Sequence, residues 1–243
     1  MDRPPSTVSW KRLLSKLWWK HNWKWAVPVA GLALLLFGPV LLVVIPLVYL
    51  GVRQSRKHTA KLRHVCEVLG FAFEDTEVRE LGARFGDFPH FALSGGTGRG
   101  LMTGSLAEHP VTVMEHFYGI RSKYSETLAV FPDGAKGLPD FELAPGLGAL
   151  GEKIQAVFGY QDINFSENEE FSKHYELRGT NEAGIRRTFD ATMLAFFAAN
   201  QGWSVQTRGG AAMIFRGHRL YAPAEVPGFL AEALNVLGEL TRR

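Results

Sequence analysis

The chain has 243 residues, with 27 Lys and Arg against 24 Asp and Glu, and a formal net charge of +3. Its single cysteine, Cys66, excludes an intramolecular disulfide and a thiolate metal cluster. The positive charge is confined to residues 1–64, which carry eleven basic residues and one acidic residue, whereas residues 65–243 have a net charge of −7. Nucleic acid is not an expected partner, because the acidic part lacks the basic surface that such binding requires.

Residues 1–25 are predicted to form a basic, tryptophan-rich helix that lies on a membrane surface. Apolar residues recur there at helical spacing, and the opposite face is basic. Indole rings favour the membrane interface, because the ring is apolar while its N–H stays hydrated. The residues expected at this interface, together with those that follow the next segment, are Trp10, Lys11, Arg12, Trp18, Trp19, Trp23, Trp25, Arg53, Arg56 and Lys57.

Residues 26–52 are predicted to cross the membrane. This uncharged, apolar run is long enough as a helix to span a hydrocarbon core of about 30 Å. It is too long for a signal peptide and is not followed by a small-residue cleavage site, so it is expected to stay on the mature protein. Gly38-Pro39 interrupts the run at its midpoint, which leaves two alternatives open: a single kinked span or a hairpin of two half-helices.

Residues 53–70 are predicted to form a basic linker helix that ends at Gly70, a residue typical of a helix C-cap. Lys and Arg are almost equally frequent before and after the apolar run, so the positive-inside rule nearly ties and only weakly favours a cytoplasmic domain. Cys66 lies in an apolar context and is expected to be a small buried hydrophobe without a chemical role.

Residues 71–243 are predicted to form one soluble α+β domain, with a mainly antiparallel sheet and packed helices. Short segments rich in aromatic and β-branched residues predict strands. Runs of strands followed by helices, without regular alternation, favour α+β over a doubly wound sheet. The predicted strands are 71–73, 88–93, 101–106, 111–117 and 125–131, with hairpin connections at 95–100 and 108–110.

The second half of this domain is predicted to alternate helices and strands after a Pro/Gly-rich connection at residues 132–148. Helical spacing of apolar residues and the expected capping residues define the helices. The paired glycines at 209–210 indicate a tight hairpin turn. The expected elements are a helix at 147–158, a strand at 171–177, a helix at 182–200, a hairpin of 203–207 with 211–216, and a last helix from Pro227.

No local motif predicts a catalytic, cofactor-binding or metal-binding residue, and no cofactor is expected. The glycine-rich segment 94–100 lacks the Gly-Lys-Ser/Thr of a phosphate loop and does not open a helix. Asp162, Asn164 and the alternating polar residues after them resemble a calcium loop, but Glu167 replaces the required glycine and Lys173 the bidentate carboxylate. A site assembled from distant residues would first be sought at His116, Tyr118, Tyr124 and Asp162.

One resemblance follows from residues 171–177 (Phe-Ser-Lys-His-Tyr-Glu-Leu), Asn181-Glu182-Ala183, the pair Arg186 and Arg187, Met193 and the hairpin at 203–215. These features resemble the C-terminal half of a group of bacterial membrane-anchored proteins of unknown function. The resemblance implies an N-terminal hydrophobic region, an α+β domain and a bacterial membrane location, and it supplies no catalytic residue. Many members carry two hydrophobic segments, so the single run here keeps the hairpin alternative open.

Two functions remain as hypotheses, both at the membrane, where anionic lipid head groups are the expected partner of the basic segment. The first is a non-catalytic binding or scaffold module for a protein, peptide or lipid, with a partner surface at Phe131, Leu138, Phe141 and Leu143. The alternative is a membrane-tethered hydrolase or transferase with a dispersed active site. The expected location is the bacterial inner membrane, with the domain on the cytoplasmic side.

Overall fold

The computed structural model describes residues 40, 42–146, 160–165 and 168–242, in two units, Met1–Lys57 and His58–Arg243. In the first unit, residues 42–57 are helical, and their large apolar side chains, among them Leu42, Ile45 and Leu50, are exposed. No helix within the described residues has both the length and the apolar character required to cross a bilayer. The predicted interfacial helix and most of the predicted span lie outside the described residues. Arg53, Arg56 and Lys57 are exposed, and their contact with lipid stays a prediction.

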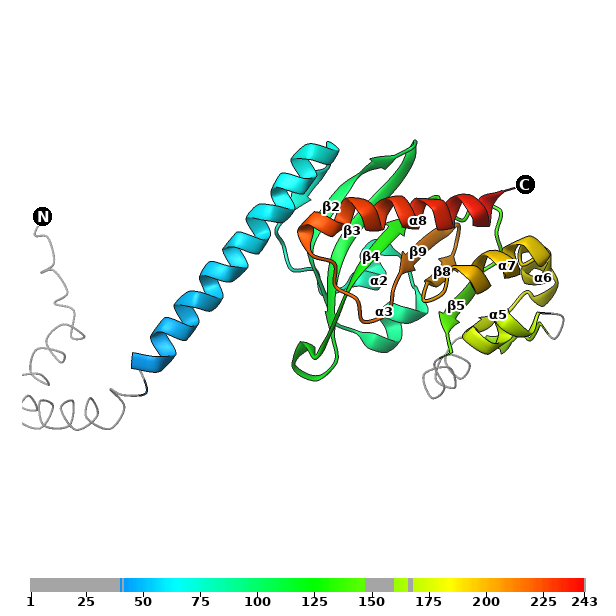
Figure 1. Ribbon diagram of the computed structural model, residues 1–243, viewed down its shortest axis with the longest axis horizontal. Helices are drawn as coiled ribbons and strands as arrows, with labels where there is room; N and C mark the ends of the chain where they lie inside the picture. The colour runs from blue at the N-terminus through cyan, green and yellow to red at the C-terminus, as the bar shows by residue number, and fades with distance from the viewer. Residues whose placement is uncertain (1–39, 41, 147–159, 166–167, 243) are drawn as a thin grey trace, which may run out of the picture. The chain divides into compact units, whose positions relative to one another are not determined.

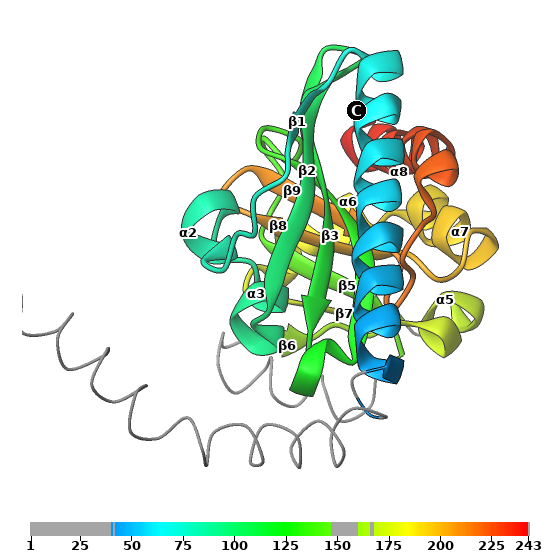
Figure 2. The same ribbon diagram turned by 90° about the vertical axis from the view of Figure 1, so that its left-hand side faces the viewer.

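The second unit is built on one antiparallel sheet, which confirms the α+β prediction. Its described part contains nine strands in the order β1-β2-β3-β4-β9-β8-β5-β7-β6 (Figures 1 and 2). The strands are β1 Ala72–Glu74, β2 Thr97–Leu106, β3 His109–Tyr118, β4 Tyr124–Phe131, β5 Phe141–Pro145, β6 Gln161–Asp162, β7 Tyr175–Gly179, β8 Ser204–Arg208 and β9 Ala211–Phe215.

Helices cover both faces of this sheet. On one face lie the helical residues 58–69 and the helices α5 Glu169–His174, α6 Glu182–Thr188, α7 Ala191–Ala199 and α8 Val226–Thr241. The opposite face carries the short helices α2 Leu81–Phe85 and α3 Pro89–Ser94, as Figure 2 shows. Two short 3-10 turns, Ile120–Ser122 and Pro223–Glu225, complete the unit. The sheet therefore separates a large apolar core from a smaller one under α2 and α3.

Several predicted elements are confirmed because local signals define them. Gly70 has a φ of 70° and ends the helical residues 58–69, while the Phe71 amide donates to the Cys66 carbonyl oxygen, as in a glycine-terminated helix. Gly209 and Gly210 have φ values of 57° and 88° at the β8–β9 turn, as a tight hairpin requires. Cys66 is buried in the large core, and burial raises the pKa of its thiol to about 11.

The predicted strand at 88–93 is wrong, because these residues form α3. Pro89 is the first helical residue, a position where its missing N–H leaves no hydrogen bond unmade. Phe88 and Phe91 pack against the sheet, which explains their apolar character without an extended backbone. Consequently the glycine-rich segment 95–100 is not the tip of a hairpin between two strands. It leads from α3 into β2, which begins at Thr97 and has a register shift between Arg99 and Met102.

Two further predictions need correction in the second half of the unit. The strand predicted at 171–177 is α5 followed by β7. The single helix predicted at 182–200 is divided into α6 and α7, because the Asp190 carboxylate accepts a hydrogen bond from the Met193 amide at 2.9 Å and begins a new helix. The Pro/Gly-rich connection at 132–148 contains β5, which the sequence did not indicate. The helix predicted at 147–158 lies outside the described residues.

Candidate functional site

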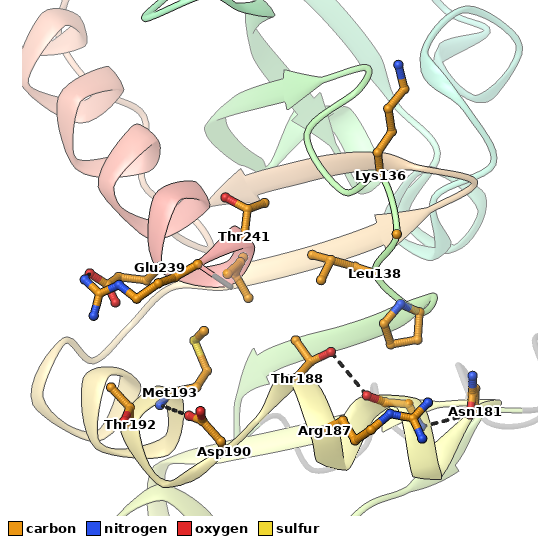
Figure 3. Close-up of a pocket in the computed structure, with 15 residues that line it drawn as sticks. Lys136, Leu138, Asn181, Arg187, Thr188, Asp190, Thr192, Met193, Glu239 and Thr241 are labelled. Atoms are coloured by element: carbon orange, nitrogen blue, oxygen red, sulfur yellow. Dashed lines mark hydrogen bonds and ion pairs between the residues drawn. The ribbon is translucent and has the colours of Figure 1, made fainter.

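An open cleft of about 830 Å³ lies between α6, α7, the C-terminal end of α8 and the loop that precedes β5 (Figure 3). Its apolar lining includes Leu138, Pro139 and Met193, and its polar lining includes the side chains of Asn181, Arg187, Thr188 and Thr192. This volume is within the usual range for small-molecule sites.

Arg187 is the basic residue of the cleft that has no ion-pair partner among the described residues, and the lining also contains Asp190, whose carboxylate accepts from the Met193 amide. The Arg187 side chain is exposed, and among the described residues no carboxylate lies within ion-pair distance of its guanidinium group. The other basic side chains of the lining are paired, Lys136 with Asp133 at 3.0 Å and Arg242 with Glu239. The Asn181 side-chain oxygen accepts from the Gly184 amide, and among the described residues no acceptor binds the side-chain N–H groups of this lining residue. The cleft therefore offers donors and a cation to a bound group.

The prediction of a partner surface at Phe131, Leu138, Phe141 and Leu143 is wrong, because most of these side chains are not exposed. Phe131, Phe141 and Leu143 are fully buried in the large core, because each lies on the sheet face that the long helices cover. Only Leu138 is partly exposed, and it lines the cleft. A strand residue with an aromatic or branched side chain more often fills a core than a docking site, and the sequence alone does not tell which face of a strand it occupies.

A second group of polar residues lies on the opposite face of the sheet, under α3. His116 and Tyr118 on β3, Glu126 on β4 and His90 on α3 converge there. The Glu126 side-chain atom Oε1 is 2.5 Å from His90 Nε2 and 3.2 Å from His116 Nδ1. Its other oxygen, Oε2, accepts from the backbone amide of His218 at 3.1 Å and the Tyr118 hydroxyl at 3.4 Å. We call His90, His116 and Glu126 the His–Glu cluster.

Burial and hydrogen bonding oppose each other at Glu126. The side chains of Glu126 and His116 are 0 % exposed, and that of His90 is 11 % exposed. Burial by itself raises the pKa of Glu126. The hydrogen bonds from His116 and His90, the charge of His90 and the hydrogen bond from the His218 amide outweigh this effect, and together they lower the pKa from 4.5 to about 2. Burial, followed by the nearby Glu126 charge, raises the pKa of Tyr118. Glu126 is therefore a permanent buried anion at physiological pH.

The loop after α3 is shaped to hold His116. The His116 atom Nε2 lies 2.8 Å from the Gly95 carbonyl oxygen. Gly96 has a φ of 93°, and a Cβ atom there would come within 2.4 Å of the Phe117 carbonyl oxygen and 2.9 Å of His116 Nε2. Only glycine fits this backbone conformation and this close approach. The Gly95-Gly96 pair thus serves the contact with His116, which a phosphate-loop comparison could not reveal.

The residues first sought for a dispersed site meet only in part. Tyr118 donates or accepts a hydrogen bond with His218 Nδ1 at 2.9 Å, and the Tyr124 ring is 5.5 Å from that of Tyr118. His116, Tyr118 and Tyr124 are therefore neighbours. Asp162 does not join them, because it lies on β6 with its Oδ1 3.9 Å from Nε of Arg178.

The polar network continues from the His–Glu cluster to β8 and β5. The Gln206 side chain accepts from the His90 amide at 3.0 Å and donates to Glu142 Oε1 at 2.6 Å. Glu142 is 4 % exposed, and its Oε2 has no hydrogen-bond partner among the described residues. Burial raises the pKa of Glu142, and although Gln206 and Arg178 lower it, the resulting pKa is about 7.

Sequence reasoning missed five of these residues: His90, Glu126, Glu142, Gln206 and His218. A signal existed for Glu126, because residues 116 and 118 on β3 and residues 124 and 126 on β4 alternate so that they share one face of a hairpin. His90 carried no such signal, since it was assigned to a strand and lies on a helix instead.

No family model matches the chain, and no curated protein sequence does. Among solved structures, the chain is similar to the crystal structure of the mycobacterial trehalose monomycolate transport factor A, TtfA. The TM-score is 0.52 at 14 % sequence identity, over 77 % of this chain and 96 % of that one. At this identity the similarity shows that the two chains share a fold.

Proposed function

We propose that this chain is a membrane-anchored, non-catalytic binding module whose cleft holds the anionic head group of a lipid. The observation that carries the proposal is the cleft itself, in which the unpaired Arg187 lies beside hydroxyl and amide groups and an apolar lining. Guanidinium groups bind phosphate and carboxylate with paired hydrogen bonds, and they do so most strongly when no internal partner competes.

The distribution of charge and apolar residues supports the proposed membrane attachment. Residues 1–64 carry a charge of +10, and no other part of the described chain covers the apolar side chains of helical residues 42–52, which are exposed. Such a surface is stabilised by hydrocarbon rather than by water. The proposal places the apolar run in a bacterial inner membrane and the domain on its cytoplasmic side, where anionic lipids attract the basic segments.

A lipid ligand is preferred for two reasons. The anchor would hold the domain beside lipid head groups, and the cleft combines polar donors with Leu138, Pro139 and Met193, as an amphiphile requires. The fold shared with a trehalose monomycolate transport factor supports a role in transport rather than in catalysis.

The hydrolase alternative has one specific observation in its favour, the contact between His116 and Glu126. However, both side chains are fully buried, and their polar atoms are engaged with each other, with Gly95 and with His218. A substrate would have to displace these hydrogen bonds at a high cost in desolvation. The cleft is therefore the better-supported site.

The proposal predicts that full-length protein in phosphatidylcholine nanodiscs binds dihexanoyl phosphatidylglycerol but not dihexanoyl phosphatidylcholine. Replacing Arg187 with glutamate should weaken this binding at least about tenfold, because a charge-assisted hydrogen bond contributes about 1.5–3 kcal/mol. Microscale thermophoresis would measure both affinities. The matched control is Arg121→Glu, since Arg121 is exposed and lies outside the cleft, and its affinity should be unchanged.

Three outcomes would contradict the proposal. Equal affinity for the two lipids would mean that the anionic head group is not recognised. An equal loss of phosphatidylglycerol affinity in Arg187→Glu and Arg121→Glu would mean that the change in net charge, and not the position of Arg187, causes the weaker binding. A failure of both lipids to bind would remove lipid as the occupant of the cleft.

A further inference from the structure

We propose that the His–Glu cluster is a binding site for a divalent transition-metal ion of the zinc class. This inference is independent of the cleft, because it uses different residues on the opposite face of the sheet. Among the described residues, His90, His116 and Glu126 are the one group of three or more His, Cys, Asp or Glu whose ligand atoms all lie within 4.8 Å of one another. Two imidazoles and one carboxylate are a ligand set that zinc accepts.

The separations between ligand atoms suit a tetrahedral ion. With metal–ligand distances of about 2.0–2.1 Å, two ligands of a tetrahedral zinc ion are about 3.3 Å apart. His116 Nδ1 and Glu126 Oε1 are already 3.2 Å apart. His90 Nε2, at 2.5 Å from the same oxygen, would have to move outward slightly. The His90 ring is 11 % exposed and lies 4.7 Å from that of Phe215, so this movement requires a small shift of the six-residue helix α3.

The atoms that would not bind the ion are already held in place. In metal sites the second nitrogen of a histidine ligand usually donates to a carbonyl or carboxylate, which fixes the ring. His116 Nε2 has that partner in the Gly95 carbonyl oxygen at 2.8 Å. The second oxygen of Glu126 is fixed in the same way by the His218 amide and the Tyr118 hydroxyl. These contacts leave His116 Nδ1 and Glu126 Oε1 directed toward His90.

The hydrogen bonding of His116 is compatible with a metal ion on Nδ1. Both of its ring nitrogens face atoms that only accept, namely the Glu126 carboxylate and the Gly95 carbonyl oxygen. Both contacts are hydrogen bonds only if each nitrogen carries a proton. A metal ion on Nδ1 replaces one of these protons and leaves neutral imidazole with its Nε2 proton on Gly95.

The ligand chemistry selects the class of ion. Imidazole favours zinc, copper, nickel and iron, whereas Mg²⁺ and Ca²⁺ prefer oxygen ligands throughout. Three protein ligands leave the fourth position of a tetrahedral zinc ion to water. An ion there would link α3 to β3 and β4, and so tie the short helix to the sheet.

The test uses full-length protein purified in detergent without a polyhistidine tag and stripped with EDTA. Zinc chloride titrated against a chromophoric chelator should show one tight site, and it should raise the thermal unfolding temperature. Cobalt chloride bound to the unmodified protein should give the intense visible absorption of a four-coordinate ion, a readout that needs no variant. A weak six-coordinate cobalt spectrum, or the lack of one stoichiometric zinc site, would overturn the proposal.

Two variants complete the test. His90→Gln should weaken zinc binding at least about 100-fold, because it removes a ligand and not merely a supporting contact. The control is His174→Gln, since His174 also lies beside one glutamate, Glu170 at 3.4 Å, but belongs to no group of three ligands in the part of the chain that the structure describes. Its zinc affinity should be unchanged. Equal zinc affinity in His90→Gln and unmodified protein, with both folded by circular dichroism, would also overturn the proposal.

Discussion

Replacing Glu126 with alanine is expected to lower the free energy of unfolding by about 4 kcal/mol, because removing one partner of a buried charge network leaves the other groups unpaired. His116 would lose the acceptor at Nδ1, His90 the acceptor at Nε2, and the His218 amide the carboxylate oxygen to which it donates. His116 gains no water in exchange, since its side chain is fully buried. The loss therefore reflects stranded polar groups as well as a missing hydrogen bond.

Urea titration of full-length protein in detergent, followed by circular dichroism in the presence of EDTA, would measure this change. The matched control is Glu232→Ala. Glu232 also contacts a basic side chain, Arg216 at 3.3 Å, but is 58 % exposed, so its loss should cost no more than about 1 kcal/mol. If the two alanine variants lose similar amounts of unfolding free energy, the network under α3 does not stabilise the fold.

The second large effect is a pH dependence that originates at Glu142. Its carboxyl group has a pKa of about 7 in the folded chain against 4.5 when unperturbed, chiefly because of burial. The folded state therefore holds the proton more tightly than the unfolded state. Below pH 4.5 both states are protonated, and between pH 4.5 and 7 only the folded state keeps its proton. The stability contributed by the neutral acid is thus lost as the pH rises, and the loss is complete above pH 7.

The whole effect is about 3 kcal/mol, because a tenfold change in proton affinity corresponds to about 1.4 kcal/mol. Glu142→Gln mimics the neutral acid and still accepts from Gln206 through its amide oxygen, so the variant should lack this pH dependence. Unfolding free energies of both proteins at pH 5 and pH 8 would show it. We expect similar values at pH 5 and a more stable variant at pH 8. A constant difference between the two proteins across this range would show that Glu142 is not the source.

The sequence predicts those elements of the fold whose signals are local. Gly70 ends a helix and Gly209-Gly210 turns a hairpin through the conformational freedom of glycine, which no distant contact needs to supply. The error at residues 88–93 has the opposite cause. Phe88 and Phe91 are apolar because they pack against the sheet. A run of aromatic residues is typical of a strand, and the sequence alone does not show that this one belongs to a helix that covers a sheet. Asp190 caps the N-terminus of α7, but the apolar residues on either side of it are spaced as in one continuous helix, so a single helix was predicted at 182–200.

The polar network could be predicted only in part, because most of its residues are distant in the sequence. His116, Tyr118 and Tyr124 were named from the sequence, and they meet because they lie on one face of a single hairpin. The remaining partners come from afar, with Gln206 116 residues from His90 and His218 92 residues from Glu126. No spacing in the sequence links such residues, since the sheet order that brings β4 beside β9 arises only on folding.

Hydrogen–deuterium exchange of the full-length protein tests the central claim, that the cleft holds an anionic lipid head group, most directly. The protein would be compared in nanodiscs of pure phosphatidylcholine and in nanodiscs containing phosphatidylglycerol. We expect phosphatidylglycerol to slow exchange in segments 136–139, 184–193 and 239–242, which contain the residues that line the cleft, while the β8–β9 turn at 209–210 is unchanged. Identical exchange of the cleft residues in both nanodiscs, or protection confined to other parts of the domain, would contradict it.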